Sequence, residues 1–337
     1  MLPQPLLLHT DAGEQSLAPA HTTVLPPAQG TALASAQNTA PVSGSAPASP
    51  PVPELTSTDT PEDRPEDRPV VTNSPAVNSE QHADVTGPPV VILHGLFGDS
   101  GNWKQQASLL RQHRTVVCMD LRNHGLSPHT EDMSFTTMAA DVVATLDHYR
   151  IDRCDLIGHS LGGKTGMQIA TDHPDRINRL VTVDIAPVDY PPHHQIIIDN
   201  LQALNLATLA QRREADKALS DTIAEPAVRQ FLLKGLVRQQ PTRPASNAWR
   251  WRFNLSAIAA CYPALCAPPE LGSPFTGPHL VIAGGRSDYV TQNNRQSFES
   301  VLPNTRFVDI PKAGHWPHSS HPELFFEQTL RFLTASL

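Results

Sequence analysis

The chain has 337 residues, enough to bury the core of one large domain or two smaller ones, and carries a formal net charge of −8. Ten acidic and two basic residues lie in 1–89, so residues 90–337 hold 23 of each sign and are neutral overall. A neutral body lacks the basic footprint that binding to nucleic acid requires, so we expect no nucleic acid among the partners. No stretch approaches 18 apolar residues in length, and no membrane span is expected.

The amino terminus does not resemble a targeting signal, because it has neither a basic start with a long apolar core nor an arginine-rich character. This absence predicts a cytoplasmic protein. The four cysteines, Cys118, Cys154, Cys261 and Cys266, do not resemble a disulfide framework in a chain of this length, so we expect reduced thiols.

Residues 16–84 are rich in Ala, Pro, Ser and Thr and include the tandem repeat PEDRPEDR at 61–68. Such a segment cannot bury enough apolar surface to offset the chain entropy that is lost on folding. It is therefore predicted to be a disordered insertion or tail, with a docking or spacer role as the functional alternative.

The pattern changes at Pro88, after which short apolar runs alternate with segments of helical spacing. The expected strands are 90–93, 115–120, 154–158 and 179–184, and the expected helices are 102–112, 135–149 and 161–172. Ser134 is the expected N-cap of the second helix. Strands that alternate with helices predict an α/β class with a mostly parallel central sheet flanked by helices.

The alternation is interrupted between 191 and 269, where the pattern is mostly helical. The expected helices there are 193–205, 207–219 and 225–238, followed by a Trp/Phe cluster. Strands at 279–283 and 306–310 and helices at 293–301 and 322–333 then resume the alternation. A helical block between two strands of a parallel sheet would lie over the carboxyl ends of the strands, where ligands bind. We therefore predict a core formed by 85–190 and 270–337, with a helical cap at 191–269 inserted before the last two strands.

The strongest functional motif is GHSLGG at 158–163, between an expected strand and an expected helix. A serine at such a junction occupies a tight turn at the edge of the sheet, and the glycines let strand and helix approach closely. The N–H groups and the positive dipole end of the following helix point toward developing negative charge. We predict that Ser160 is a nucleophile.

A serine nucleophile needs a general base within hydrogen-bond reach, expected in the loop after the last strand. His315 lies there, in a Gly-His-Trp sequence, whereas His318 and His321 are rivals that are expected to be solvated. The spacing of the three histidines could suggest a metal site, but no carboxylate or cysteine cluster supports one. We therefore predict His315 as the base and expect no metal and no cofactor.

Two residues compete for the acid that would orient the imidazole. Asp184 ends the strand after the nucleophile helix, in Asp-Ile-Ala-Pro, and Asp288 follows the next strand, in GGRSDY. Either loop could reach His315 and fix its tautomer, so the pattern itself leaves the choice open.

The oxyanion hole needs two N–H donors aimed at the developing alkoxide. Leu161, directly after the nucleophile, is expected to supply one of them. The second is expected from the HGLFG loop after the first strand of the body, with Leu96 preferred and Phe97 as the alternative. His94 and the polar DLRNHG loop at 120–125 are interpreted as structural support for the site.

Five motifs occur in a characteristic order and spacing: HGLFGD, DLRNHG, GHSLGGK, DIAPV and AGHW. Together they resemble the YbfF-like branch of the α/β-hydrolases, small esterases active on acyl esters and acyl-CoA thioesters, from about Pro88 to the carboxyl terminus. The resemblance implies the α/β-hydrolase fold. It also implies Asp184 as the acid, assisted by Ser287 in the loop after the next strand, with Asp288 as the alternative acid.

Members of that branch usually begin with a short strand pair just before the HGLFG motif, whereas here the Ala/Pro-rich segment occupies that space. Residues 5–14, PLLLHTDAGE, resemble such an opening strand. We therefore predict an opening strand of the hydrolase sheet within 1–15, with 5–10 paired to the sheet, and 16–84 as a long insertion.

The motifs predict a serine hydrolase that cleaves carboxylic esters or acyl thioesters, including acyl-CoA, through an acyl-enzyme on Ser160. The expected partner is a small acyl ester or thioester, and the apolar cluster of the cap favours an apolar acyl chain where it faces the site. The alternatives are an acyltransferase or C–C hydrolase with the same triad, or a non-catalytic ligand-binding protein on this scaffold. The oligomeric state is left open.

Overall fold

The computed structural model of the protein describes residues 22–25, 87–239 and 249–336. The described residues belong to one compact unit made of Met1–Ala28 and Val85–Leu337, and a second unit, Gln29–Asp84, falls outside them. The predicted opening strand at 5–10 also lies outside the described residues.

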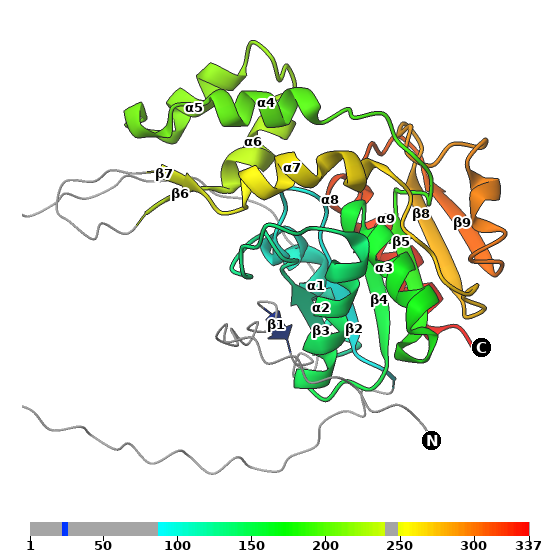
Figure 1. Ribbon diagram of the computed structural model, residues 1–337. Helices are drawn as coiled ribbons and strands as arrows, with labels where there is room; N and C mark the ends of the chain where they lie inside the picture. Colours follow the sequence, from blue (N-terminus) through cyan, green and yellow to red (C-terminus); the bar gives the residue numbers. More distant parts are fainter. Residues whose placement is uncertain (1–21, 26–86, 240–248, 337) are drawn as a thin grey trace, which may run out of the picture. The chain divides into compact units, whose positions relative to one another are not determined.

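The central element is a sheet that has seven strands within the described part of the chain, in the order β1-β3-β2-β4-β5-β8-β9 (Figure 1). All neighbours pair in parallel except β1, which is antiparallel to β3. The strands are β1 Thr22–Leu25, β2 Val90–Leu93, β3 Val116–Met119, β4 Cys154–His159, β5 Ile177–Val183, β8 His279–Gly284 and β9 Thr305–Ile310. Every residue of β2, β3, β4, β5 and β8 is buried, as expected for parallel strands covered on both faces.

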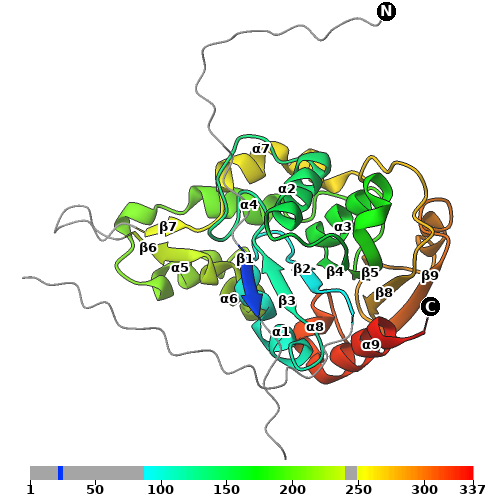
Figure 2. The same cartoon turned by 90° about the horizontal axis from the view of Figure 1, so that it is seen from below.

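Helices cover both faces of this sheet (Figure 2). Helices α2 (Phe135–His148) and α3 (Leu161–Asp172) pack on one face, and α1 (Lys104–Leu110) and α9 (Pro322–Thr334) on the other. Alternate residues of the strands therefore enter two separate apolar clusters. The predicted cap of α2 is confirmed, because Ser134 Oγ accepts the N–H of Thr137 at 3.2 Å.

Residues 191–269, here called the insertion, enter between β5 and β8, and those described, 191–239 and 249–269, lie above the carboxyl ends of the strands (Figure 1). Its elements are α4 Gln195–Ala203, α5 Arg212–Leu219, α6 Pro226–Lys234, β6 Leu236–Arg238, β7 Trp249–Trp251 and α7 Leu255–Cys266. The expected helix 225–238 is too long, because the chain leaves α6 at Gly235 and enters the hairpin β6–β7. The expected helix 293–301 is only the single 3₁₀ turn Arg295–Phe298.

Strand β1 corrects the prediction of disorder for 16–84 at four residues. Thr22–Leu25 pairs antiparallel with Met119–Val116 at the edge of the sheet. The sequence Thr-Thr-Val-Leu is β-branched and apolar, which favours a strand wherever a free edge is offered. The prediction of disorder rested on the composition of all of 16–84, in which four residues of this kind do not stand out.

The described residues contain no helix that is both long and apolar enough to cross a membrane. All four cysteines are free thiols, with Cys118 and Cys154 buried, which confirms the expectation of reduced thiols.

Because His279 is buried, we expect the protein to lose stability in acid. Its Nδ1 donates to Thr305 Oγ1 at 2.7 Å and its Nε2 accepts from Thr182 Oγ1 at 2.8 Å, while burial lowers its pKa to about 3. The folded protein holds this ring neutral, whereas the unfolded chain binds a proton below pH about 6.5. The stability that the neutral ring contributes is therefore fully present above pH about 6.5 and is lost as the pH falls toward 3.

His279→Gln is expected to reduce the slope of unfolding free energy against pH by about 1.4 kcal/mol per pH unit between pH about 4 and 6. Urea denaturation of both proteins across this range measures the two slopes. His148→Gln is the matched control, because that side chain is exposed at the end of α2 and its replacement should leave the slope as in the wild type. Equal slopes in the wild type and His279→Gln would contradict the prediction.

Candidate active site

Ser160 occupies the turn between β4 and α3, where its backbone has φ 51° and ψ −114°. A positive φ is strained for a residue with a side chain, and such strain collects at functional sites. The turn leaves no room for larger neighbours. A Cβ on Gly158 would lie 2.2 Å from the carbonyl oxygen of Gly162, and a Cβ on Gly162 would lie 2.6 Å from that of His94.

The carboxylate of Asp184, directly after β5, is fully buried and accepts three hydrogen bonds. Its Oδ1 accepts the N–H of Gly284 at 2.8 Å. Its Oδ2 accepts His315 Nδ1 at 2.8 Å and Ser287 Oγ at 2.5 Å. Asp288, one residue further along, is exposed and lies outside this network. The structure thus brings together Asp184, Ser287 and His315.

His315 is held on a second side by an aromatic ring that the sequence analysis did not single out. The ring of Tyr289 stacks on the imidazole with 3.9 Å between centroids and 23° between planes. Tyr289 directly follows Ser287 and Asp288, and its N–H lies 3.3 Å from Ser287 Oγ. Its place in the GGRSDY motif is the one sequence signal that could have pointed to it.

The two candidates for the second oxyanion donor differ in their hydrogen bonds. The N–H of Phe97 donates to His124 Nε2 at 3.1 Å and is not available to a ligand. Leu96, one residue earlier, lines the same cavities as Ser160. Leu161 stands at the first position of α3, where the positive end of the helix dipole lies. This geometry favours the pair Leu96 and Leu161.

The polar groups behind this loop act as its support. His124 Nδ1 lies 3.0 Å from the carbonyl of Arg122, and burial lowers the pKa of His124 to about 3, which keeps its Nε2 an acceptor for Phe97. His94 is buried in a similar way, and its Nε2 accepts the N–H of Leu121 at 3.0 Å. Both contacts fit the structural role that the sequence predicted for His94 and the loop 120–125.

The three histidines near the carboxyl terminus have separate surroundings. His318, in α8 (Pro317–Ser320), is buried and stacks on Trp103 with 4.3 Å between centroids, so the prediction that it is solvated is wrong. His321 Nδ1 contacts the hydroxyl of Ser320 at 2.9 Å. Across residues 22–25, 87–239 and 249–336, no group of three or more His, Cys, Asp or Glu side chains is arranged to hold a metal ion.

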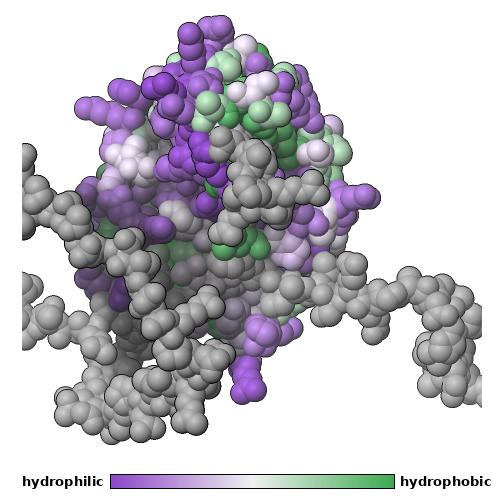
Figure 3. Space-filling view, turned by 90° about the vertical axis from the view of Figure 1, so that its left-hand side faces the viewer, coloured by the Kyte–Doolittle hydropathy of each residue, from purple (hydrophilic) through white to green (hydrophobic). Residues whose placement is uncertain are grey.

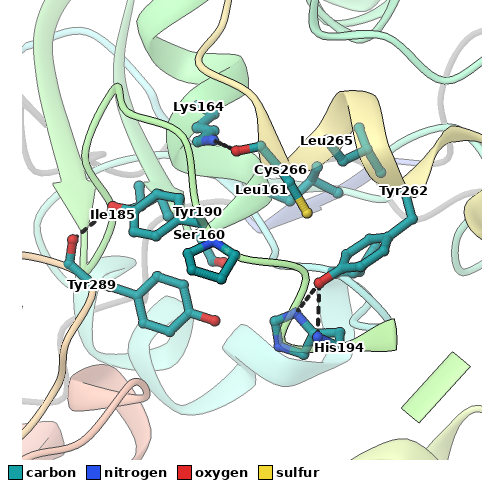
Figure 4. Close-up of a pocket in the computed structure, with 12 residues that line it drawn as sticks. Ser160, Leu161, Lys164, Ile185, Tyr190, His194, Tyr262, Leu265, Cys266 and Tyr289 are labelled. Carbon is teal, nitrogen blue, oxygen red and sulfur yellow. Dashed lines mark hydrogen bonds between the residues drawn. The ribbon is translucent and has the colours of Figure 1, made fainter. Parts of the chain in front are cut away.

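Two adjoining cavities meet at Ser160. The wide cavity, about 490 Å³, extends under the insertion toward α6. The narrow cavity, about 50 Å³, extends toward α7 (Figure 4). Both are lined by Leu96, Ser160, His194 and Tyr289. A substrate whose carbonyl carbon is placed at Ser160 can therefore extend one substituent into each cavity.

Lys164, in α3, bonds the chain just before the insertion and at the carboxyl-terminal end of the insertion, where Cys266 lies (Figure 4). Its Nζ donates to the carbonyl oxygens of Val188 at 3.0 Å, Cys266 at 2.9 Å and Ala267 at 2.6 Å. Burial lowers its pKa to about 8. The position of the insertion is thus tied to α3, the helix that begins directly after Ser160.

Comparisons with known proteins agree with this fold. A model of the α/β-hydrolase fold family matches residues 88–322. The chain is 36% identical over 258 residues to the mouse protein named sn-1-specific diacylglycerol lipase ABHD11, which covers 74% of this chain and 82% of that protein. It is 35% identical over 246 residues to esterase YbfF of Escherichia coli, and the match covers 73% of this chain and 92% of that protein. A solved marine microorganism esterase matches with a TM-score of 0.70 at 34% identity, covering 73% of this chain and 95% of that one.

The fold is that of an α/β hydrolase. The chain belongs to the α/β-hydrolase fold family, as the motifs predicted, and within it to the esterase and lipase type.

Proposed function

We propose that the chain hydrolyses carboxylic esters through an acyl-enzyme on Ser160, with His315 as general base and Asp184 as the acid that orients it. The observation that carries the proposal is the 2.8 Å hydrogen bond between His315 Nδ1 and the buried carboxylate of Asp184. His315 also lines the same cavity as Ser160. Because Nδ1 donates to Asp184, Nε2 is the nitrogen left to take the serine proton.

The reaction then proceeds in two steps. His315 takes the proton of Ser160 as Oγ attacks the ester carbonyl carbon, and the tetrahedral oxyanion accepts the N–H groups of Leu161 and Leu96. Collapse expels the alcohol, which receives the proton from His315. Water then loses a proton to His315, attacks the acyl-enzyme and releases the carboxylic acid, while the proton returns to Ser160.

Ser287 has a positioning role in this proposal. Its hydroxyl donates to Asp184 Oδ2 and accepts the N–H of Tyr289 at 3.3 Å, so it links the acid to the ring that stacks on His315. Loss of the hydroxyl would leave Asp184 with two hydrogen bonds and a freer carboxylate.

The insertion is proposed to act as a cap that binds the acyl chain. Its contribution to the wide cavity is mostly apolar, and includes Ile197, Val228, Phe231 and Leu232. Apolar residues also gather near the top of the face drawn in Figure 3, the end at which the insertion lies. An apolar wall favours an aliphatic acyl group of an ester or of a thioester such as acyl-CoA. A cytoplasmic location stays a prediction from the sequence.

A panel of p-nitrophenyl esters and acyl-CoA thioesters with acyl chains of increasing length tests the proposal. We expect turnover of the esters, with Val228→Trp shifting the preference toward shorter chains because the larger ring fills the wide cavity. Leu126→Trp is the control, since that side chain is exposed outside the cavities. Acyl transfer to an added alcohol with no hydrolysis would favour an acyltransferase. No turnover and no labelling of Ser160 by a fluorophosphonate would favour a ligand-binding protein.

A further inference from the structure

His194 stands at the junction of the two cavities but has no part in the mechanism above. It directly precedes α4 and lines both cavities together with Ser160. Its ring makes an edge contact with Phe97, at 6.4 Å and 76°, beside the oxyanion loop. A histidine in this place faces whatever substituent flanks the reacting carbonyl.

Two contacts join His194 to Tyr262 of α7 (Figure 4). The backbone N–H of His194 donates to Tyr262 Oη at 2.8 Å, and the same oxygen lies 3.2 Å from His194 Nδ1. Because the backbone can only donate, the hydroxyl accepts that bond, which leaves its own proton able to be donated to Nδ1. When Tyr262 donates to Nδ1, that nitrogen is an acceptor and the ring proton resides on Nε2.

The electrostatic surroundings keep this ring neutral. Burial, with a smaller electrostatic contribution from the neighbouring His315 and His193, lowers the pKa of His194 to about 4. A ring with this pKa is a weak base at neutral pH and is poorly suited to remove a proton from serine or water. It remains a neutral N–H donor whose orientation is set by Tyr262 and Phe97.

We propose that His194 Nε2 donates a hydrogen bond to a second oxygen of the substrate, next to the ester that is cleaved. The favoured substrates are then esters with an ether, hydroxyl or further ester oxygen close to the scissile group, rather than plain alkyl esters. The physical reason is that a purely alkyl substrate would cover this donor and leave it unpaired, which costs binding energy. The inference rests on the ester hydrolysis proposed above.

Two pairs of isosteric esters test it, because in each pair one oxygen replaces one methylene. Butyl octanoate is compared with 2-methoxyethyl octanoate, which carries the oxygen on the alcohol side. Butyl octanoate is also compared with butyl 3-butoxypropanoate, which carries the oxygen on the acyl side. The readout is the ratio of kcat/KM within each pair, so a general loss of activity in a variant cancels.

In at least one pair, the preference for the oxygen-containing ester should be about three- to ten-fold greater in the wild type than in His194→Phe. His194→Gln should restore part of it, because its amide can also donate. Tyr262→Phe should give an intermediate ratio, because the ring proton can then move to Nδ1. The control is His193→Gln, an exposed neighbour outside both cavities, which should keep the wild-type ratio.

Ratios in His194→Phe equal to those of the wild type in both pairs would overturn the inference and leave the proposed function standing. Failure of the wild type to hydrolyse any of the three esters would overturn the proposed function, and the inference with it.

Discussion

Replacement of Ser160 by alanine is expected to lower kcat for ester hydrolysis by about 10⁴-fold or more. The variant has no hydroxyl to form the acyl-enzyme, so only direct attack by water within the oxyanion hole remains. Initial rates on a p-nitrophenyl ester measure the loss, and a fluorophosphonate probe, which labels an activated serine, should label the wild type only. Residual activity above about one tenth of the wild type would mean that another group is the nucleophile.

A second variant at the same position separates catalysis from folding. Ser160→Gly should be as inactive as Ser160→Ala, yet more stable than it by about 1 kcal/mol, because glycine adopts the φ of 51° without strain. Chemical denaturation of the two variants compares their free energies of unfolding. An inactive but well-folded Ser160→Gly would exclude misfolding as the cause of lost activity.

Replacement of Asp184 by asparagine is expected to lower kcat/KM by about 10⁴-fold. An amide offers one acceptor where the carboxylate accepts three hydrogen bonds, and its NH₂ group would meet donors. The imidazole of His315 would then turn or adopt the wrong tautomer, and the positive charge that forms on it would lose its partner. Rates on the same ester and the rate of fluorophosphonate labelling of Ser160 should fall together.

Asp288→Asn is the matched control, because it makes the same chemical change at an exposed carboxylate in the neighbouring loop. The kcat/KM of this variant should stay within about two-fold of the wild-type value, as is usual for a surface change away from the site. The reverse order, with Asp288→Asn inactive and Asp184→Asn active, would make Asp288 the acid.

The elements recognised from the sequence are those with a strong local signal. Helix α3 begins and ends where the spacing predicted, and β2 was expected at the residues where it lies. The hairpin β6–β7 and helix α7 were missed, because β6 and β7 are three residues long and α7 is almost uniformly apolar, with Pro263 inside it. Neither of these patterns has a clear period, so packing over the core decides their structure.

The choice between Asp184 and Asp288 as the acid could not be made from the local sequence pattern. β5 and β8 are neighbours in the sheet, so the loops that carry Asp184 and Asp288 begin side by side. Reading the residues by themselves could not separate them, and the family resemblance favoured Asp184. The structure separates them by burial, since Asp184 accepts bonds from three groups while Asp288 is exposed.

What the sequence determined by itself is the fold class, the junction that carries Ser160 and the loop that carries His315. Each depends on residues close together in the chain: a strand, a glycine-bounded turn and a helix, or a strand followed by Gly-His-Trp. Only the tertiary structure decided that Tyr289 stacks on His315, that Lys164 bonds the chain on both sides of the cap elements, and that Tyr262 contacts His194. These contacts join residues from 24 to 103 positions apart. They arise when the insertion and the core pack together, and no local pattern of residues encodes them.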